Sequence, residues 1–221
     1  MQVRVTIEGT KPLLHHQDNI QWGERIKEWA KDPENKPRSI AGDDRSPAFT
    51  WIGSLYHDGV RVTIPSDNIM TMLREGGAQV LTGQGKKTFK AQTQSGLIPL
   101  ECDWPLFTFT DDDWHEMLVE DILELEGNED FSEHVSVVQS LGFDLFVKRA
   151  RIGRAKHVRV RPIFRTWTAA GDFEVVDDQL TPDIIQRIVT LGGRLKGLGD
   201  WRPSSPTPGG FGTFTATVEE I

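Results

Sequence analysis

The sequence predicts an α+β fold in which an antiparallel sheet packs against two core helices. Three observations lead to this fold class. Stretches with apolar residues at every second position open and close the chain, two stretches between them carry helix-start and helix-stop signals, and the elements follow the order strand, helix, strands, helix, strand. With 221 residues, 37% of them hydrophobic, the chain is long enough for one large domain with a buried core.

The opening strand is expected over residues 3–9, where apolar and polar side chains alternate up to a glycine. Residues 15–50 have little apolar periodicity and several prolines, so we interpret them as an insertion that holds at most a short helix. A hairpin is expected next, because the segments 51–56 and 60–64 flank an Asp-Gly pair that favours a tight turn.

Two core helices are expected at 66–76 and 181–193. The first begins with Ser66 as its N-cap, and the second begins with Thr181 as N-cap and Pro182 at the first helical position. Each has apolar residues at helical spacing and then reaches a pair of glycines, which is a common stop signal.

Further strands are expected between and after these helices. Residues 97–110 are rich in strand-forming side chains, and a hairpin is expected where 158–167 alternates and 170–172 turns the chain into 173–176. A closing strand is expected at 211–219. This order suits a modified ferredoxin-like or RRM-like antiparallel sheet with two core helices and insertions.

A second insertion is expected at 111–133, where eleven acidic residues surround an apolar stripe. We interpret it as an amphipathic helical segment with a solvated acidic face. The chain is therefore expected to be one domain, 1–221, with insertions at about 15–50 and 111–133.

Composition excludes several classes of protein. The single cysteine, Cys102, allows neither an intramolecular disulfide nor a four-cysteine zinc site, so we expect a reducing, cytoplasmic location. No basic start followed by an apolar run and no apolar stretch of about 18 residues occurs, so no membrane is expected. Neither Walker nor Rossmann glycine spacing is present, and we expect no cofactor and no metal.

The net charge is −8, but positive and negative residues are unevenly distributed along the chain. Residues 145–171 contain no acid and eight cations, and the rest of the chain has a net charge of −16. Eight cations without an interspersed acid would repel one another in the absence of a partner, so we expect this arm to bind a phosphate backbone. The eight are Lys148, Arg149, Arg151, Arg154, Lys156, Arg159, Arg161 and Arg165. A second contact is expected at Lys86, Lys87 and Lys90.

A second candidate binding element is the glycine-rich loop at 194–212. Its glycines allow close approach to phosphates, and Trp201 beside Arg202 offers a ring on which a base can stack. Arg194 and Lys196 add positive charge. The loop glycines are Gly197, Gly199, Gly209, Gly210 and Gly212.

This loop also carries a family resemblance. Gly197-Leu-Gly-Asp-Trp-Arg-Pro followed by Gly210-Phe-Gly-Thr-Phe, after a helix and before a terminal strand, resembles the glycine-rich loop of the RAMP superfamily of CRISPR-associated RNA-binding proteins. The opening Ile7-Glu-Gly-Thr-Lys-Pro-Leu-Leu-His-His, with Ile64-Pro-Ser-Asp-Asn-Ile-Met-Thr-Met-Leu and Gly85-Lys-Lys, is similar to small phage and prophage relatives of the CRISPR backbone subunit. The resemblance implies an RRM-like fold, single-stranded nucleic acid in a basic groove, and copies that stack head to tail.

Three function classes remain open at this stage. The first is a non-enzymatic protein that binds single-stranded RNA or DNA and forms a homo-oligomer or filament. The second is a metal-independent endoribonuclease, since RAMP endoribonucleases use a histidine near the first strand, a place held here by His15 and His16. Adjacent residues on an extended segment face opposite ways, so at most one of the two can act. The third is a protein-interaction module or decoy that docks on a CRISPR or recombination complex.

Overall fold

The computed structural model describes residues 1–221, except for the side chain of Ile152. Its larger sheet is built on four long strands whose neighbouring pairs are all antiparallel. In spatial order they are β10 (Phe214–Glu220), β1 (Gln2–Gly9), β9 (Trp167–Val175) and β5 (Asp103–Thr110).

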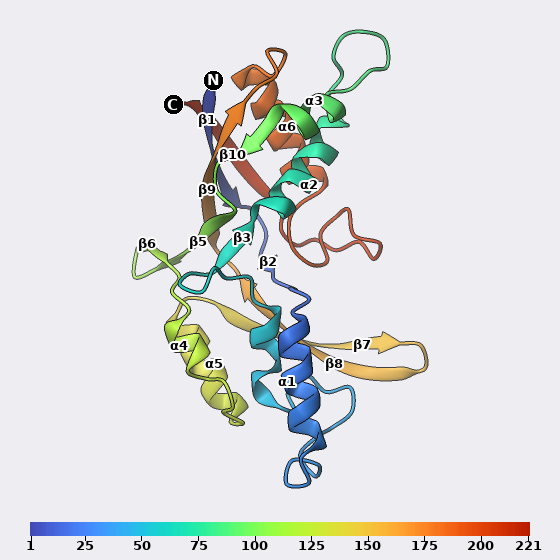
Figure 1. The fold of residues 1–221 in the computed structure, drawn as a ribbon, viewed down its shortest axis with the longest axis vertical. Coiled ribbons are helices and arrows are strands. Elements are labelled where there is room, and N and C mark those ends of the chain that lie inside the picture. Colours follow the sequence, from blue (N-terminus) through green and yellow to red (C-terminus); the bar gives the residue numbers. More distant parts are fainter.

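Two helices pack together beside this sheet, α2 (Ser66–Gly77) and α6 (Pro182–Leu195) (Figure 1). In chain order the core is β1, α2, β5, β9, α6, β10. This order, combined with the spatial order β10-β1-β9-β5, is the βαββαβ arrangement of ferredoxin-like and RRM-like folds. The predicted fold class is confirmed.

The sequence patterns explain these core elements. In β1 the apolar positions Val3, Val5 and Ile7 are buried and the residues between them are exposed. In α6, the Thr181 hydroxyl accepts a hydrogen bond from the Ile184 amide and Pro182 fills the first helical position, as predicted. Apolar periodicity therefore predicts β1 correctly, and the capping residues correctly predict the start of α6.

The starts and stops of the two helices differ from the prediction in two details. Ser66 is the first residue of α2 and Pro65 is its N-cap, while the Ser66 hydroxyl donates to the Glu101 carbonyl. Gly192 and Gly193 do not end α6, which continues to Leu195. A Cβ at Gly192 would meet the Met72 sulfur, so this glycine serves the close contact between α6 and α2.

The hairpin predicted with a turn at 170–172 is wrong, because β9 runs straight through these residues. Gly171 lies within the strand, and the Cα of this glycine faces the fully buried indole ring of Trp104. A Cβ at this position would overlap the Trp104 ring. The glycine is therefore a packing requirement of the sheet and not a turn signal.

A smaller sheet has the strand order β2 (Leu13–Leu14), β8 (Ala155–Phe164) and β7 (Asp144–Ile152). The basic segment predicted as an arm is the β7–β8 hairpin, with continuous pairing from Asp144 opposite Ile163 to Ile152 opposite Ala155. Figure 1 shows it projecting from the body of the protein. We call residues 144–164 the basic hairpin.

The first insertion forms α1 (Ile20–Lys31), whose Asn19 side chain caps the Trp22 amide. The strand predicted at 51–56 is wrong: Ala48–Ser54 is a short 3-10 helix, η1, with buried Trp51 at its centre. The expected Asp-Gly turn is present, since His57 and Val62 form an antiparallel bridge around it. β3 (Thr63–Pro65) then joins the edge of the larger sheet beside β5.

Residues 90–99 form α3 (Lys90–Gly96) and β4 (Leu97–Pro99), which pairs with β9. The acidic insertion contains β6 (Asp113–Glu116) and α4 (Glu120–Leu123), and α5 (Phe131–Ser140) follows. The helical interpretation missed β6, which pairs with β5 through a two-residue turn. Asp111 and Asp112 hold that turn at positive φ, a conformation that aspartate tolerates better than most residues.

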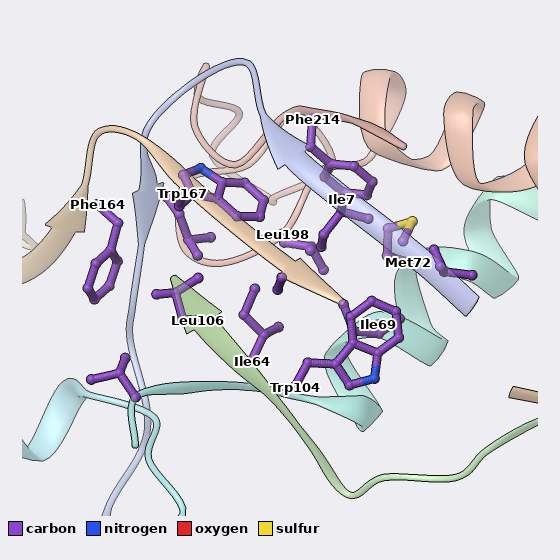
Figure 2. Close-up of a cluster of buried hydrophobic side chains, with 14 of the residues drawn as sticks. Ile7, Ile64, Ile69, Met72, Trp104, Leu106, Phe164, Trp167, Leu198 and Phe214 are labelled. Carbon is purple, nitrogen blue, oxygen red and sulfur yellow. The ribbon is translucent and has the colours of Figure 1, made fainter. Parts of the chain in front are cut away.

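The core lies between the larger sheet and the two helices. Figure 2 shows Leu198 of the glycine-rich loop among Ile7, Trp167 and Met72, side chains that come from three other elements. Because Leu198 is buried, the loop is anchored to the core at its start. No helix in the described part of the chain combines the length and the apolar character needed to cross a membrane.

Candidate nucleic-acid interface

The basic hairpin has two faces that its register defines. Phe146 pairs with Arg161 and Lys148 pairs with Arg159, so these four side chains share one face. Arg151 pairs with Lys156 on the opposite face. The predicted cations therefore do not form one stripe, because alternation along each strand distributes them over both faces.

Three of the eight predicted cations have carboxylate partners. Arg159 and Arg161 both contact Asp44, at 3.0 and 3.4 Å, and Arg165 contacts Asp144 at 2.6 Å. Asp44 reaches them because residues 42–44 pair with Val158 on β8. Sequence reasoning missed this acid, since it lies 115 positions from Arg159 in a segment without periodicity.

The other five cations are exposed and take part in none of the ion pairs among the described residues. Arg151 donates to the carbonyl of Gly153 at the tip of the hairpin. The hairpin therefore presents unneutralised charge along its outer part, the feature needed for contact with phosphates. These five are Lys148, Arg149, Arg151, Arg154 and Lys156.

The glycine-rich loop meets the basic hairpin through three aromatic rings. The centroid of the Phe146 ring lies 5.8 Å from that of Trp201 and 5.6 Å from that of Phe211. The ammonium of Lys148 lies 4.2 Å from the centroid of the Trp201 ring. The structure thus brings together the two segments that the sequence singled out separately.

A hollow of about 200 Å³ lies at this junction, and we call it the stacking hollow. Its lining combines the aromatic rings of Phe146 and Trp201 with the cations of Lys148, Arg159 and Arg161. Rings provide faces on which bases stack and cations provide charge for phosphates, which together are the features of single-strand binding sites.

His16 and Asp200 close one side of the stacking hollow. Arg161 donates to Nε2 of His16 at 3.1 Å, and a guanidinium can only donate, so the ring proton of neutral His16 is on Nδ1. Nδ1 lies 3.5 Å from the Asp200 carboxylate. The hydrogen bond from His16 lowers the pKa of Asp200, and burial lowers the pKa of Arg161.

His15 faces the other way. Its ring is fully buried between Tyr56 and Phe164, and its Nδ1 accepts the Tyr56 amide. Burial lowers the pKa of His15 to about 3, which keeps the ring neutral. Of the two histidines considered as catalysts, only His16 borders the stacking hollow.

The loop glycines mostly allow the loop to fold on itself. A Cβ at Gly199 would meet the Leu14 carbonyl, one at Gly209 that of Trp201, and one at Gly212 that of Leu198. A Cβ at Gly197 would lie 3.0 Å from both the Gly212 carbonyl and Pro203. Gly210 alone has open space around it, so close approach of a ligand to the loop backbone is possible there.

The remaining predicted residues are dispersed. Lys86 and Lys87 lie in the loop before α3 and Lys90 begins α3, at the end of the protein far from the basic hairpin (Figure 1). Arg194 is exposed in the last turn of α6 and Lys196 is its C-cap. Arg202 donates to the Gly199 carbonyl and to the Ser204 hydroxyl, so it also holds the loop in shape.

The uncovered face of the larger sheet has a different chemistry. RRM domains stack bases on aromatic side chains of this face, but the central strands β1 and β9 present residues such as Thr6, Thr168 and Ala170 there. The charged residues on this face are mostly acidic, namely Glu8, Asp172, Glu174 and Glu219 with Arg4. Arg4 is paired with Asp172 at 2.7 Å.

Among the described residues, no group of three or more His, Cys, Asp or Glu side chains is arranged to hold a metal ion. Comparison with known proteins adds no relative: no protein-family model matches the chain, and no curated protein matches its sequence.

Proposed function

We propose that the protein binds single-stranded nucleic acid, RNA or DNA, in the cytoplasm, without cleaving it, as a RAMP-like protein. One observation carries the proposal: the stacking hollow joins the rings of Phe146 and Trp201 to the cations Lys148, Arg159 and Arg161, and further exposed cations follow along the same hairpin. Charge without rings would suit any polyanion, and rings without charge would suit a peptide. Their combination favours a single strand, whose bases are free to stack.

The charge distribution supports this location. A strand in the stacking hollow would meet Lys148, Arg159 and Arg161, whereas on the open sheet face it would meet four carboxylates. Like charges raise the cost of binding and opposite charges release counterions from the strand. The hairpin side of the protein is therefore the side we assign to nucleic acid.

The test is a set of affinity measurements with single- and double-stranded RNA and DNA across a range of salt concentrations. Single strands should bind more tightly than duplexes, and log Kd should rise with log salt at about 0.7 per phosphate contacted. Equal binding of duplex would contradict the stacking role of the rings. The absence of binding to every form would favour instead a module that docks on a CRISPR or recombination complex.

We also propose that copies assemble head to tail along the strand. The acidic elements β6 and α4 and the basic hairpin lie on opposite sides of the protein (Figure 1), so unlike surfaces of successive copies can meet and the chain of copies does not close. Light scattering or electron microscopy with oligonucleotides of about 15 to 60 nucleotides should show assemblies that lengthen with the strand and shorten in high salt. One protein per oligonucleotide at every length would overturn this part of the proposal.

A second candidate function, metal-independent RNA cleavage, is favoured by one contact. His16 borders the stacking hollow and has Asp200 as an orienting carboxylate. Its Nε2 is occupied by Arg161, so it lacks the free nitrogen that a general base needs. Incubation of labelled RNA with the protein in EDTA decides between the candidates: intact RNA supports binding alone, and cleavage that disappears in His16→Ala supports the nuclease.

A further inference from the structure

A second hollow lies on the other side of His16 and Asp200, and we call it the polar hollow. The helix α2 supplies one wall with Asn68, Thr71 and Glu75, and the glycine-rich loop supplies the opposite wall. Its volume is about 200 Å³, enough for a planar base and too little for a folded stem. Because the two hollows share His16 and Asp200, a strand in one can place an adjacent nucleotide in the other.

The polar side chains of this wall are placed by helical spacing. Thr71 and Glu75 lie one turn apart on the same face of α2, and buried Met72 lies beside them in the lining. None of the ion pairs among the described residues includes Glu75. The hollow therefore offers a carboxylate without a charged partner, next to a hydroxyl.

The charges of the hollow select the part of a nucleotide that can enter it. Arg202 also lines the hollow, but its guanidinium donates to the Gly199 carbonyl and the Ser204 hydroxyl of the loop. Glu75 and Asp200 would repel a phosphate, and an ionised carboxylate only accepts hydrogen bonds. A base edge with hydrogen-bond donors meets this requirement. Guanine alone among the common bases presents two adjacent donors, N1–H and the N2 amino group, to one carboxylate, and its O6 beside them is an acceptor.

We propose that the polar hollow binds a guanine base of the single strand, with the Glu75 carboxylate accepting from N1–H and the N2 amino group and the Thr71 hydroxyl donating to O6. The inference rests on the proposed function, because it assigns base preference to the same bound strand. It makes the protein selective at one nucleotide while the hairpin contacts remain independent of sequence.

The first experiment needs no variant. Affinities are measured for an all-uridine RNA, for the same RNA with one central guanosine, and for that RNA with inosine, which keeps N1–H and lacks the N2 amino group. Guanosine should bind between about 5-fold and 100-fold more tightly than uridine, the range of one bidentate base contact, and inosine should fall between them. Binding of all three with equal affinity overturns the guanine site and leaves the proposed function standing, whereas binding of none overturns both.

The second experiment assigns the preference to Glu75. In Glu75→Gln one acceptor is replaced by a donor, so the guanosine preference should fall close to 1 while affinity for the all-uridine RNA changes less than about twofold. Asp67→Asn is the matched control, because it removes the same charge from exposed α2 surface outside the hollow. A preference that survives Glu75→Gln, or that Asp67→Asn also removes, contradicts the assignment. Circular dichroism establishes that each variant is folded.

Discussion

On the open face of the larger sheet, the central strands present small hydroxyl side chains and carboxylates around one arginine that is already paired, and the rings of Phe109 and Trp114 lie to one side on β5 and β6. In the stacking hollow, the rings of Phe146 and Trp201 lie among cations. Both surfaces belong to one RRM-like fold, and the sheet face is the one that such domains use for RNA. The comparison teaches that the fold class does not locate the site. In the function we propose, the elements outside the βαββαβ core, the hairpin and the loop, provide the chemistry for nucleic acid.

The largest effect is expected from the exposed cations of the basic hairpin. The combined substitution of Arg149, Arg151, Arg154 and Lys156 by alanine should weaken single-strand binding about a hundredfold or more and reduce the salt slope by about 3, because each lost phosphate contact removes about 0.7. Arg159 and Arg161 are left intact, since their loss would leave Asp44 unpaired. Fluorescence anisotropy at several salt concentrations measures both quantities.

The control for this variant removes charge elsewhere. Replacement of Lys86, Lys87 and Lys90 by alanine takes three cations from the far end of the protein, and affinity should change only slightly. An equal loss in both variants would mean that overall charge, and not the hairpin, determines binding.

A smaller loss is expected from Trp201→Ala, which removes the stacking ring. Base–aromatic stacking contributes about 1–3 kcal/mol, so affinity should fall between about 5-fold and 100-fold. Trp114→Ala is the matched control on the open sheet face, where Trp114 packs against Phe109 with ring centroids 5.4 Å apart. A greater loss in the Trp114 variant would reverse the comparison and place the strand on the sheet.

The sheet itself can be tested through stability. Gly171→Ala pushes a Cβ into the buried Trp104 ring and should lower the free energy of unfolding by about 1–3 kcal/mol. Gly210→Ala, where no atom lies within 4 Å, should change it by less than about 0.5 kcal/mol. Urea denaturation measures both, and similar stability in the two variants would contradict the packing role of Gly171.

The last effect concerns pH and two adjacent histidines, buried His15 and His16 at the edge of the stacking hollow. The pKa of His15 is about 3 in the folded protein and about 6.5 in the unfolded chain. Between these two pH values, His15 is therefore protonated in the unfolded chain and neutral in the folded protein. Stability from this residue is complete above pH 6.5 and is lost as pH falls toward 3, at up to about 1.4 kcal/mol per pH unit.

The variant His15→Asn checks this slope. The asparagine side-chain oxygen can still accept a hydrogen bond from the Tyr56 amide, but asparagine does not titrate. Denaturant midpoints compared between pH 7 and 5 should therefore fall less for the variant than for the wild type. Parallel loss in both proteins would show that His15 is not the titrating group.

The core elements illustrate what could be predicted from sequence. Alternation at Val3, Val5 and Ile7 and the Thr181-Pro182 cap are local patterns, and the structure has the strand and the helix at these places. Glycine was less informative, since Gly171 and Gly192 looked like turn or stop signals and are instead sites of close packing. A single sequence gives the residue type but not the neighbour that makes the missing side chain necessary.

Some features of the candidate site could likewise be predicted from the sequence, and others could not. The sequence by itself determined the order strand, helix, strands, helix, strand, the acid-free run of eight cations and the presence of Trp201 in a glycine-rich loop, because periodicity, capping and charge composition are properties of neighbouring residues. Only the tertiary structure decided that Phe146, Lys148 and Trp201 meet, that Asp44 neutralises Arg159 and Arg161, and that His15 is buried while His16 borders the site. These contacts join residues tens of positions or more apart, and they depend on strand register and on where the insertions fold back, which local patterns do not encode.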